Sequence, residues 1–531
     1  MSSEKAVDAP IDPPPVLTRI QSQLGPIATR QSVLEHGHPV VEEGAEVKLS
    51  QGRKWALLVI FSLALFVDVV GSSAFFVFTG VVAPDLDIVF EQQSWVITSY
   101  TVTFSSSLLL WGRVSDLYSP SPVFKYNMFS LAALSLLLSF LPDKYSFFVF
   151  RALCGISAAA LVPSAFRLIV AIFEPHELGR AFTLYGMSGA LGNVLGLELA
   201  GVFSLIPGQG QMAAWRWFFR GVAVVVFPVA LVCLELVPTP KGAANESGAK
   251  WKRLDLLGAM SMLSAIILLV LSLNFGATYG FRTASFLVPF ILAFPLLFFF
   301  FFWESRQPPG FALLPSSTWR IPNFTTLIIF ALLPLGWWSV NFVPLVEIFR
   351  DVHGESNIMA ATRMLPEGIA AAAVCVVMGT WTSASARPRW PVVGAMVSCI
   401  VAYVLWIKSG TQVGADYWRF IFPGMIIGSA GMQVVLTGVN VAVMTAVPPS
   451  QAGVAGATLQ SAYQVGAAIA LSIQAGLMTV HEGGVENFSN VQASWYFELG
   501  WTVCWLIVFL VFYRPGRNAK SVGADPELVV V

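Results

Sequence analysis

The chain has 531 residues, of which 56% are hydrophobic and only 11% are charged. A water-soluble domain carries about 25% charged residues because its surface faces water, so this composition excludes an ordinary soluble protein. Its 30 Lys and Arg residues balance 30 Asp and Glu residues, which gives no reason to expect nucleic acid as a partner.

Residues 1–54 are polar, contain the run Pro13–Pro15 and have no apolar core. They lack the pattern of a cleavable signal peptide, so we predict a disordered cytoplasmic tail and expect the first apolar run to act as the insertion signal. The five cysteines fall inside apolar runs without CxxC spacing. No disulfide framework, metal site or cofactor is predicted from them.

Long apolar runs dominate the rest of the chain. A helix needs about 20 mostly apolar residues to cross the hydrocarbon layer of a bilayer. The runs lie near 55–80, 94–111, 124–141, 147–170, 181–206, 218–238, 255–275, 284–303, 323–349, 359–382, 391–407, 418–446, 455–479 and 496–513. The sequence therefore predicts an all-α membrane protein with about fourteen transmembrane helices.

The spacing of these runs divides the chain into two sets of six, with two additional runs between them. The segments are an N-terminal six-helix bundle (55–238), a cytoplasmic loop (239–254), two additional helices (255–303), a Pro-containing connector (304–322), a C-terminal six-helix bundle (323–513) and a cytoplasmic tail (514–531). Most Lys and Arg residues lie on the side of the N-terminal tail, and positive residues favour the cytoplasm. Both termini are therefore expected to be cytoplasmic, as an even number of spans requires.

Asp68 stands in the middle of the first run, in LFVDVVGSSAFF. An ionisable residue at the bilayer centre costs about 2.5–3.5 kcal/mol, so it calls for an explanation. A neighbouring helix could neutralise it for packing alone, but we favour a substrate or proton role. The predicted spans contain no histidine, so a coupling proton would have to be carried by a carboxylate.

Two further ionisable residues are candidates for proton coupling beside Asp68. Arg151 begins the fourth run and could instead extend to the headgroups. Glu198 lies in the fifth run, in GMSGALGNVLGLELAG, where glycines at helical spacing predict close helix packing. Arg363 and Glu367 are four residues apart, and we interpret them as a structural pair on one helix face.

Neutral polar and aromatic residues of the later runs are candidates for substrate binding. Gln460 and Gln464 share one helix face and could bond a ligand or neighbouring helices. Trp337, Trp338 and Phe342 could line an apolar cavity or simply face lipid.

The second run ends in GRVSDLYSPSP, a tight turn containing Gly112, Arg113 and Asp116. A carboxylate there can pair with a cationic residue or with a helix N-terminus of the other bundle. Such a contact would act as a conformational latch that holds one state and is released in the other.

The turn resembles the signature G-x-x-x-D-R-x-G-R-R of the major facilitator superfamily at Gly112 and Asp116. Arg151 with Gly155 is similar to that family's fourth-helix motif R-x-x-x-G. The segments 95–113 and 213–219 resemble the fungal drug:proton antiporters with fourteen spans, in their aminotriazole-resistance-type branch.

This sequence departs from the family pattern at two places. The antiporter motif G-P-x-x-G-G reads GNVLGL here, with Asn193 in place of proline and Leu197 in place of the second glycine. The corresponding turn of the second half, in segment 379–389, keeps glycine and basic residues but lacks the acidic one.

The resemblance implies two six-helix bundles that rock about a midplane cavity, with the two additional helices packed outside that core. It also implies export of small organic or toxic compounds in exchange for protons, and we favour the plasma membrane over the vacuole. Uptake or facilitated diffusion of a nutrient or an iron chelate is the alternative. An enzyme or receptor is disfavoured, because no catalytic cluster and no large soluble domain occur. Nothing in the sequence indicates an oligomeric state.

Overall fold

The computed structural model describes residues 49–89, 92–93, 95–238, 253–308, 311–314, 317–380, 389–410 and 414–514. The chain divides into two compact units, Met1–Glu46 and Val47–Val531. The first unit lies outside the described residues, as do nearly all of the predicted tails and most of the predicted loop 239–254.

The N-terminal half consists of helices that follow the predicted apolar runs. The first run is divided at Ala74, whose N–H still bonds to Val70 O, so the two pieces continue each other. The helices are α3 (Gln51–Ser73), α4 (Phe75–Asp85), α5 (Trp95–Tyr118), α6 (Pro120–Leu138), α7 (Lys144–Ile172), α8 (Pro175–Phe203), η2 (Gly210–Met212) and α9 (Ala214–Leu236).

The additional pair and the C-terminal half follow in the same way. The predicted run 323–349 is broken before Pro334, which starts a new helix because proline fits the first helical turn. The helices are α10 (Leu256–Tyr279), α11 (Ala284–Arg306), η4 (Thr318–Arg320), α12 (Phe324–Phe330), α13 (Pro334–Glu347), η5 (Ile348–Val352), α14 (Asn357–Thr380), α16 (Arg389–Ile407), η6 (Tyr417–Ile421), α17 (Phe422–Ala446), η7 (Pro449–Gln451), α18 (Ala452–Leu477), η8 (Gly484–Glu486) and α19 (Phe488–Phe512).

The expected all-α membrane fold is confirmed in the described part of the chain, which contains helices and no strands. Twelve helical segments there are long and apolar enough to cross a membrane. Helices α5 and α18 are 24 and 26 residues long, which also suffices, but they carry more Ser, Thr and Gln. Counting these two gives the fourteen crossings that the sequence predicts.

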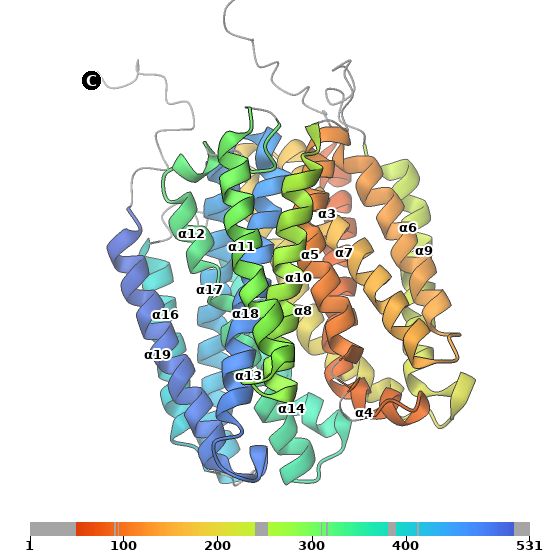
Figure 1. The fold of residues 1–531 in the computed structure, drawn as a ribbon, viewed down its shortest axis with the longest axis vertical. Coiled ribbons are helices and arrows are strands. Elements are labelled where there is room, and N and C mark those ends of the chain that lie inside the picture. Colours follow the sequence, from red (N-terminus) through yellow and green to blue (C-terminus); the bar gives the residue numbers. More distant parts are fainter. Residues whose placement is uncertain are drawn as a thin grey trace, which may run out of the picture. The chain divides into compact units, whose positions relative to one another are not determined.

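The helices pack into two groups that meet along two seams. Helix α5 packs on α7 and α3 packs on α8 within the first half, and α17 packs on both α14 and α16 within the second. The seams between the halves are α8 against α14 and α5 against α18. Helix α3 begins, and α19 ends, at the same end of the bundle (Figure 1). We call this end the terminal end.

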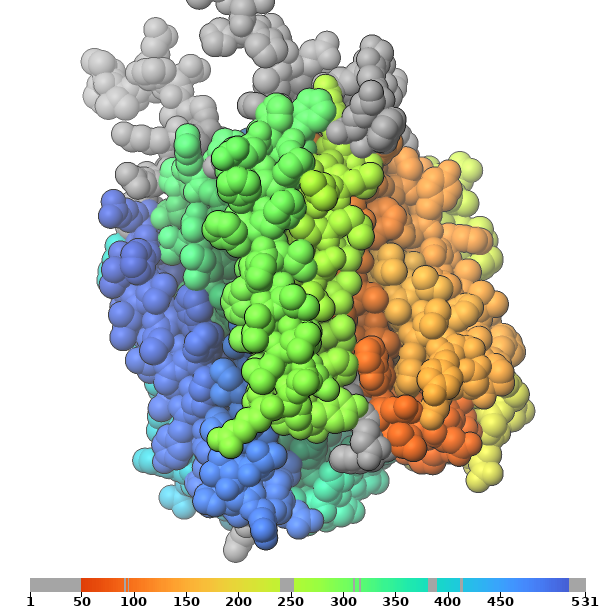
Figure 2. All heavy atoms as spheres, in the orientation of Figure 1, coloured from red at the N-terminus to blue at the C-terminus, as the bar shows by residue number. Residues whose placement is uncertain are grey.

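The additional pair covers the junction of the two halves, as the green surface in Figure 2 shows. Helix α11 lies outside the core as expected, with only Ala293, Phe300 and Glu304 buried. Helix α10 does not, because it packs against both α5 and α18. Thr98 Oγ1 donates to Asn274 Oδ1 at 3.2 Å, and Ser472 Oγ donates to Leu273 O at 3.1 Å. The prediction that both additional helices pack outside the core is therefore wrong for α10.

Candidate functional site

A cavity of about 370 Å³ lies between the two halves. Helices α3, α5, α8, α10, α13, α14, α17 and α18 all contribute to its wall. The wall is mainly apolar and aromatic, but it includes the carboxyl groups of Asp68 and Glu367. None of the described residues that line it is Lys, Arg or His. Its fixed formal charges are thus only negative.

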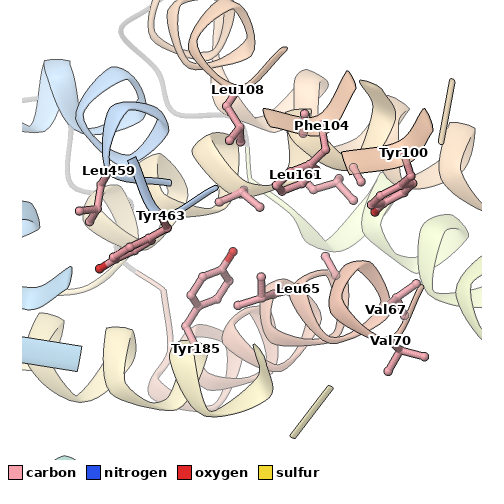
Figure 3. Close-up of a cluster of buried hydrophobic side chains, with 14 of the residues drawn as sticks. Leu65, Val67, Val70, Tyr100, Phe104, Leu108, Leu161, Tyr185, Leu459 and Tyr463 are labelled. Atoms are coloured by element: carbon pink, nitrogen blue, oxygen red, sulfur yellow. The ribbon is translucent and has the colours of Figure 1, made fainter. Parts of the chain in front are cut away.

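Asp68 enters this cavity from the last two turns of α3 and is only 6% exposed. The O–H of Tyr100 on α5 donates a hydrogen bond to its carboxylate. Tyr100 is held in place by stacking on Phe104, with the ring planes 9° apart. Figure 3 shows Tyr100 and Phe104 in the same buried cluster as Tyr185 of α8 and Tyr463 of α18.

Arg151 lies behind Tyr100, is 1% exposed and is not part of the cavity wall. Its Nε donates to Val96 O at 3.3 Å and its Nη1 donates to Gly71 O at 3.2 Å. The guanidinium carbon lies 4.0 Å from the ring centroid of Phe75 and 4.8 Å from that of Tyr100. Tyr100 therefore contacts both Arg151 and Asp68 and connects the buried cation to the cavity carboxylate.

The structure separates the third predicted coupling residue from this cluster. Glu198 is half-buried near the end of α8, beside Thr362 of α14, and does not line the cavity. The glycines that precede it do pack closely on another helix: a Cβ at Gly192 would lie 2.9 Å from Phe66 O of α3. The signal that sequence analysis interpreted as helix packing is thus a contact between α8 and α3.

The residues predicted to bind substrate are divided in the same way. Gln460 and Gln464 line the cavity from α18, and Trp338 and Phe342 line it from α13. Trp337 does not, because it is fully buried among Tyr403 and Trp406, with ring centroids 5.4 and 5.5 Å away. Adjacent helical residues point about 100° apart, and here Trp338 faces the cavity while Trp337 faces Tyr403 and Trp406.

Glu367 also differs from the prediction. Arg363 pairs with Glu355, Nη2 to Oε1 at 2.5 Å, because the chain after η5 places Glu355 beside it. The carboxyl group of Glu367 lines the cavity instead and accepts a hydrogen bond from Asn341 Nδ2 at 2.9 Å. Its position in the middle of an apolar run was the available signal, and the proximity of Arg363 in the sequence masked it.

Asp116 lies at the terminal end, where α5 meets the N-terminus of α18. Its carboxylate accepts hydrogen bonds from Gly453 N at 3.2 Å and Val454 N at 2.9 Å. Arg167 of α7, which sequence analysis did not single out, places its Nε 3.4 Å from Asp116 Oδ1. The carboxylate thus satisfies N–H groups that a helix N-terminus leaves without intrahelical partners.

The other two residues of the predicted latch have different contacts. A Cβ at Gly112 would lie 2.7 Å from Ala457 Cβ, so only glycine lets α5 approach α18 this closely. Arg113 donates from Nε and Nη2 to Arg253 O, at 3.2 and 2.9 Å. It therefore ties α5 to the segment that leads into α10.

Comparisons with known proteins agree with this geometry. The sequence profile of the Major Facilitator Superfamily matches residues 61–256. The solved proton:xylose symporter XylE aligns over 88% of this chain and 97% of its own, with a TM-score of 0.60 and 11% identity. The chain has the major facilitator fold.

Related sequences extend the similarity over most of the chain. The puromycin resistance protein pur8 of Streptomyces alboniger is 28% identical over 440 residues, covering 82% of this chain and 83% of that protein. A low affinity ammonium transporter of Saccharomyces cerevisiae is 25% identical, covering 77% and 78%. The multidrug transporter mfsC of Aspergillus fumigatus is 24% identical, covering 81% of each chain.

These similarities indicate that the chain is a multi-pass membrane transporter with the major facilitator fold rather than an enzyme. Its cavity is accordingly interpreted as a passage for a small molecule.

Proposed function

We propose that this transporter exports small organic compounds in exchange for protons, and that Asp68 carries the exchanged proton. The observation that supports this most directly is the position of Asp68, a buried carboxyl in the wall of a mainly apolar central cavity. A carboxyl group in such a place is costly when it is charged and unpaired, so proton binding and release change the energy of the site strongly.

The surroundings of Asp68 suit a group that alternates between two charge states. Tyr100 can donate to the ionised carboxylate, and Arg151 behind it adds a fixed positive charge. When Asp68 is protonated, the tyrosine hydroxyl can accept instead of donate. Tyr185, a second hydroxyl in the wall of the same cavity, also interacts with Asp68.

Exchange requires that the cavity opens to the two sides in turn. The hydrogen bonds that Asp116 accepts from the N-terminus of α18 join the halves at the terminal end, and so does the bond that its ion-pair partner Arg167 donates to Pro449 O. We propose that these contacts hold that end closed and are broken when it opens. Release of a proton from Asp68 at the open terminal end would then prepare the cavity for the next compound.

We further propose that the terminal end faces the cytoplasm of a cell whose plasma membrane holds the protein. Basic residues at that end, including Arg113, Arg167 and Arg180, support this orientation under the positive-inside rule. An epitope tag placed after residue 531 should be inaccessible to antibody in intact cells and accessible after permeabilisation. Labelling of intact cells at their surface would reverse the orientation.

The export proposal is tested with Asp68→Asn in reconstituted vesicles. A growth screen of cells with and without the protein first identifies a toxic compound whose effect it relieves. We expect the variant to insert normally but to lose flux of that compound in response to an imposed pH gradient. Glu498→Gln is the matched control, because Glu498 is another fully buried carboxyl that does not line the cavity.

Proton-driven flux from Asp68→Asn at the wild-type rate would remove Asp68 from the mechanism. The direction of flux separates export from the alternative of uptake or facilitated diffusion. An exporter moves the compound against its own gradient when protons flow the opposite way, whereas a facilitator only equalises the compound and ignores the pH gradient.

A further inference from the structure

We propose that Glu367 is a substrate-binding carboxylate and that the transported compounds are organic cations carrying N–H donors, such as protonated amines or guanidinium groups. This inference rests on the proposed transport function and names the substrate class of the same cavity. It begins from the charges of the wall: Asp68 and Glu367 are acidic, and none of the described lining residues is basic.

Glu367 has an incomplete set of hydrogen bonds. Its Oε1 accepts from Asn341 Nδ2 at 2.9 Å, whereas its Oε2 is buried without a partner among the described residues. The side chain is 2% exposed and forms part of the cavity wall. A buried carboxylate oxygen without a donor is costly, so a donor brought by a ligand would be favoured there.

Amides of the same wall add acceptor oxygens that lack a partner among the described residues. Gln433 Nε2 donates to Thr437 Oγ1 at 3.2 Å, but the Oε1 atom of the same amide has no partner among the described residues. Asn440 Oδ1 is likewise buried without a donor, and both residues line the cavity from α17. A ligand with several N–H groups would satisfy these oxygens together, whereas an anion would be repelled by the two carboxylates when they are ionised.

Aromatic rings complete a site for a cation. Phe76 of α4 and Phe342 of α13 meet across the cavity, with ring centroids 6.1 Å apart. Trp338 also lines the cavity, and its indole N–H donates to Ser429 Oγ at 2.9 Å, which fixes the ring. The faces of aromatic rings attract cations, so the wall favours an aromatic or alkyl ammonium ion over a neutral compound of the same shape.

The two carboxyl groups therefore have separate roles. Asp68 has Tyr100 as a donor and Arg151 close behind it, whereas Glu367 has neutral groups beside it, the amide of Asn341 and the hydroxyl of Ser429, and no basic residue of the cavity wall. The positive charge that Glu367 lacks would come from the ligand. Binding of a cation would then stabilise the ionised form of Glu367 while the proton remains exchangeable at Asp68.

The test compares amines with alcohols of the same carbon skeleton. Tryptamine and tryptophol, followed by pairs with larger ring systems, are measured by equilibrium dialysis against the purified full chain in detergent. We expect the amine of a pair to bind more tightly than the alcohol. Glu367→Gln should weaken amine binding by about ten- to hundredfold and leave alcohol binding within about twofold.

Glu498→Gln is the matched control and should preserve the wild-type preference. Glu498 is also membrane-embedded and fully buried without a hydrogen-bond partner among the described residues, but it lies outside the cavity wall. Thermal melting of each variant in the same detergent shows whether it is folded. If Glu367→Gln does not fold, Glu367→Asp replaces it, which should keep the preference for amines at lower affinity.

The proposal is wrong if no amine of the series binds the wild-type protein more tightly than its alcohol. It is also wrong if Glu367→Gln keeps the full preference. Either result leaves the exporter proposal intact, provided that Asp68→Asn still abolishes pH-driven flux. Conversely, a clear preference for amines together with wild-type proton coupling in Asp68→Asn would retain this inference and reject the exchange mechanism.

Discussion

Arg151 shows how one buried cation can be stabilised without a direct carboxylate partner. Its guanidinium donates to two backbone carbonyls and lies over the rings of Phe75 and Tyr100. The planar guanidinium group suits this site because it can stack on rings and donate at its edge at the same time. A lysine ammonium would provide the charge without the stacked plane.

We therefore predict that Arg151→Lys destabilises the protein while preserving its formal charge. A single ammonium cannot lie over both rings and also reach both carbonyl groups, and each cation–π contact contributes about 0.5–2 kcal/mol, so the substitution should cost about 1–3 kcal/mol. Thermal melting in detergent measures this. Arg350→Lys is the control, because Arg350 pairs with the adjacent Asp351 at the surface and should cost less than about 1 kcal/mol. Equal melting temperatures for the two variants would contradict the prediction.

Among the helices, α10 has the most unexpected role. Val270, Leu273, Asn274 and Ala277 line the cavity, so an additional helix forms part of the passage. The backbone carbonyl of Leu273 in α10 accepts a hydrogen bond from Ser472 of α18. The carbonyl of Arg253, just before α10, accepts one from Arg113 of α5. Helix α10 thus closes the gap between α5 and α18 on one side of the cavity.

At this scale we predict that Asn274→Leu changes which compounds are transported. The substitution removes a polar group from the wall and its bond with Thr98. Polar compounds should lose about five- to thirtyfold in affinity, whereas apolar ones should not, and membrane insertion should be unaffected. Transport KM across a series of compounds provides the measurement.

Asn127→Leu is the control for this experiment. Asn127 is a half-buried amide that bonds only to Val123 of its own helix, α6, and lies outside the cavity wall. An identical shift of KM in both variants would show that the wall position of Asn274 does not matter.

At the scale of the whole molecule, the two halves are joined at the terminal end by hydrogen bonds and by a close approach of two helices. Asp116 accepts hydrogen bonds from the N-terminus of α18, Arg167 beside it donates to Pro449 O, and Gly112 allows α5 to touch Ala457. Hydrogen bonds to a charged group contribute about 1.5–3 kcal/mol, which is enough to bias a two-state equilibrium by tenfold or more.

Asp116→Asn should therefore shift the population toward a state that is open at the terminal end. The amide keeps one acceptor oxygen but loses the charge that strengthens the hydrogen bonds from the N-terminus of α18. Spin labels at the exposed positions His176 and Ser450 report the distance between the two halves at this end. Electron paramagnetic resonance should show about a tenfold larger population of the longer distances in this variant. Asp351→Asn, whose carboxylate pairs at the surface with Arg350, should leave the distribution unchanged. An unaltered distribution in Asp116→Asn would exclude the latch.

The sequence by itself determined that the protein lies in a membrane and where its long apolar helices run. Both follow from local composition, since about 20 apolar residues in a row can be stable only in lipid or a core. It also identified Asp68, because a carboxyl in the middle of such a run is conspicuous whatever surrounds it. The Ser, Thr and Gln content of α5 and α18 is readable too, and these helices proved to line the cavity.

The tertiary structure alone decided which side chains meet. Hydropathy does not fix the rotation of a helix about its axis, so Trp337 and Trp338 were indistinguishable until α13 was packed on Tyr403 and Trp406. The partners of Asp116 lie 337 and 338 residues away in the chain, and those of Glu367 lie on another helix. Such contacts depend on how whole helices pack against each other, which no local stretch of sequence encodes.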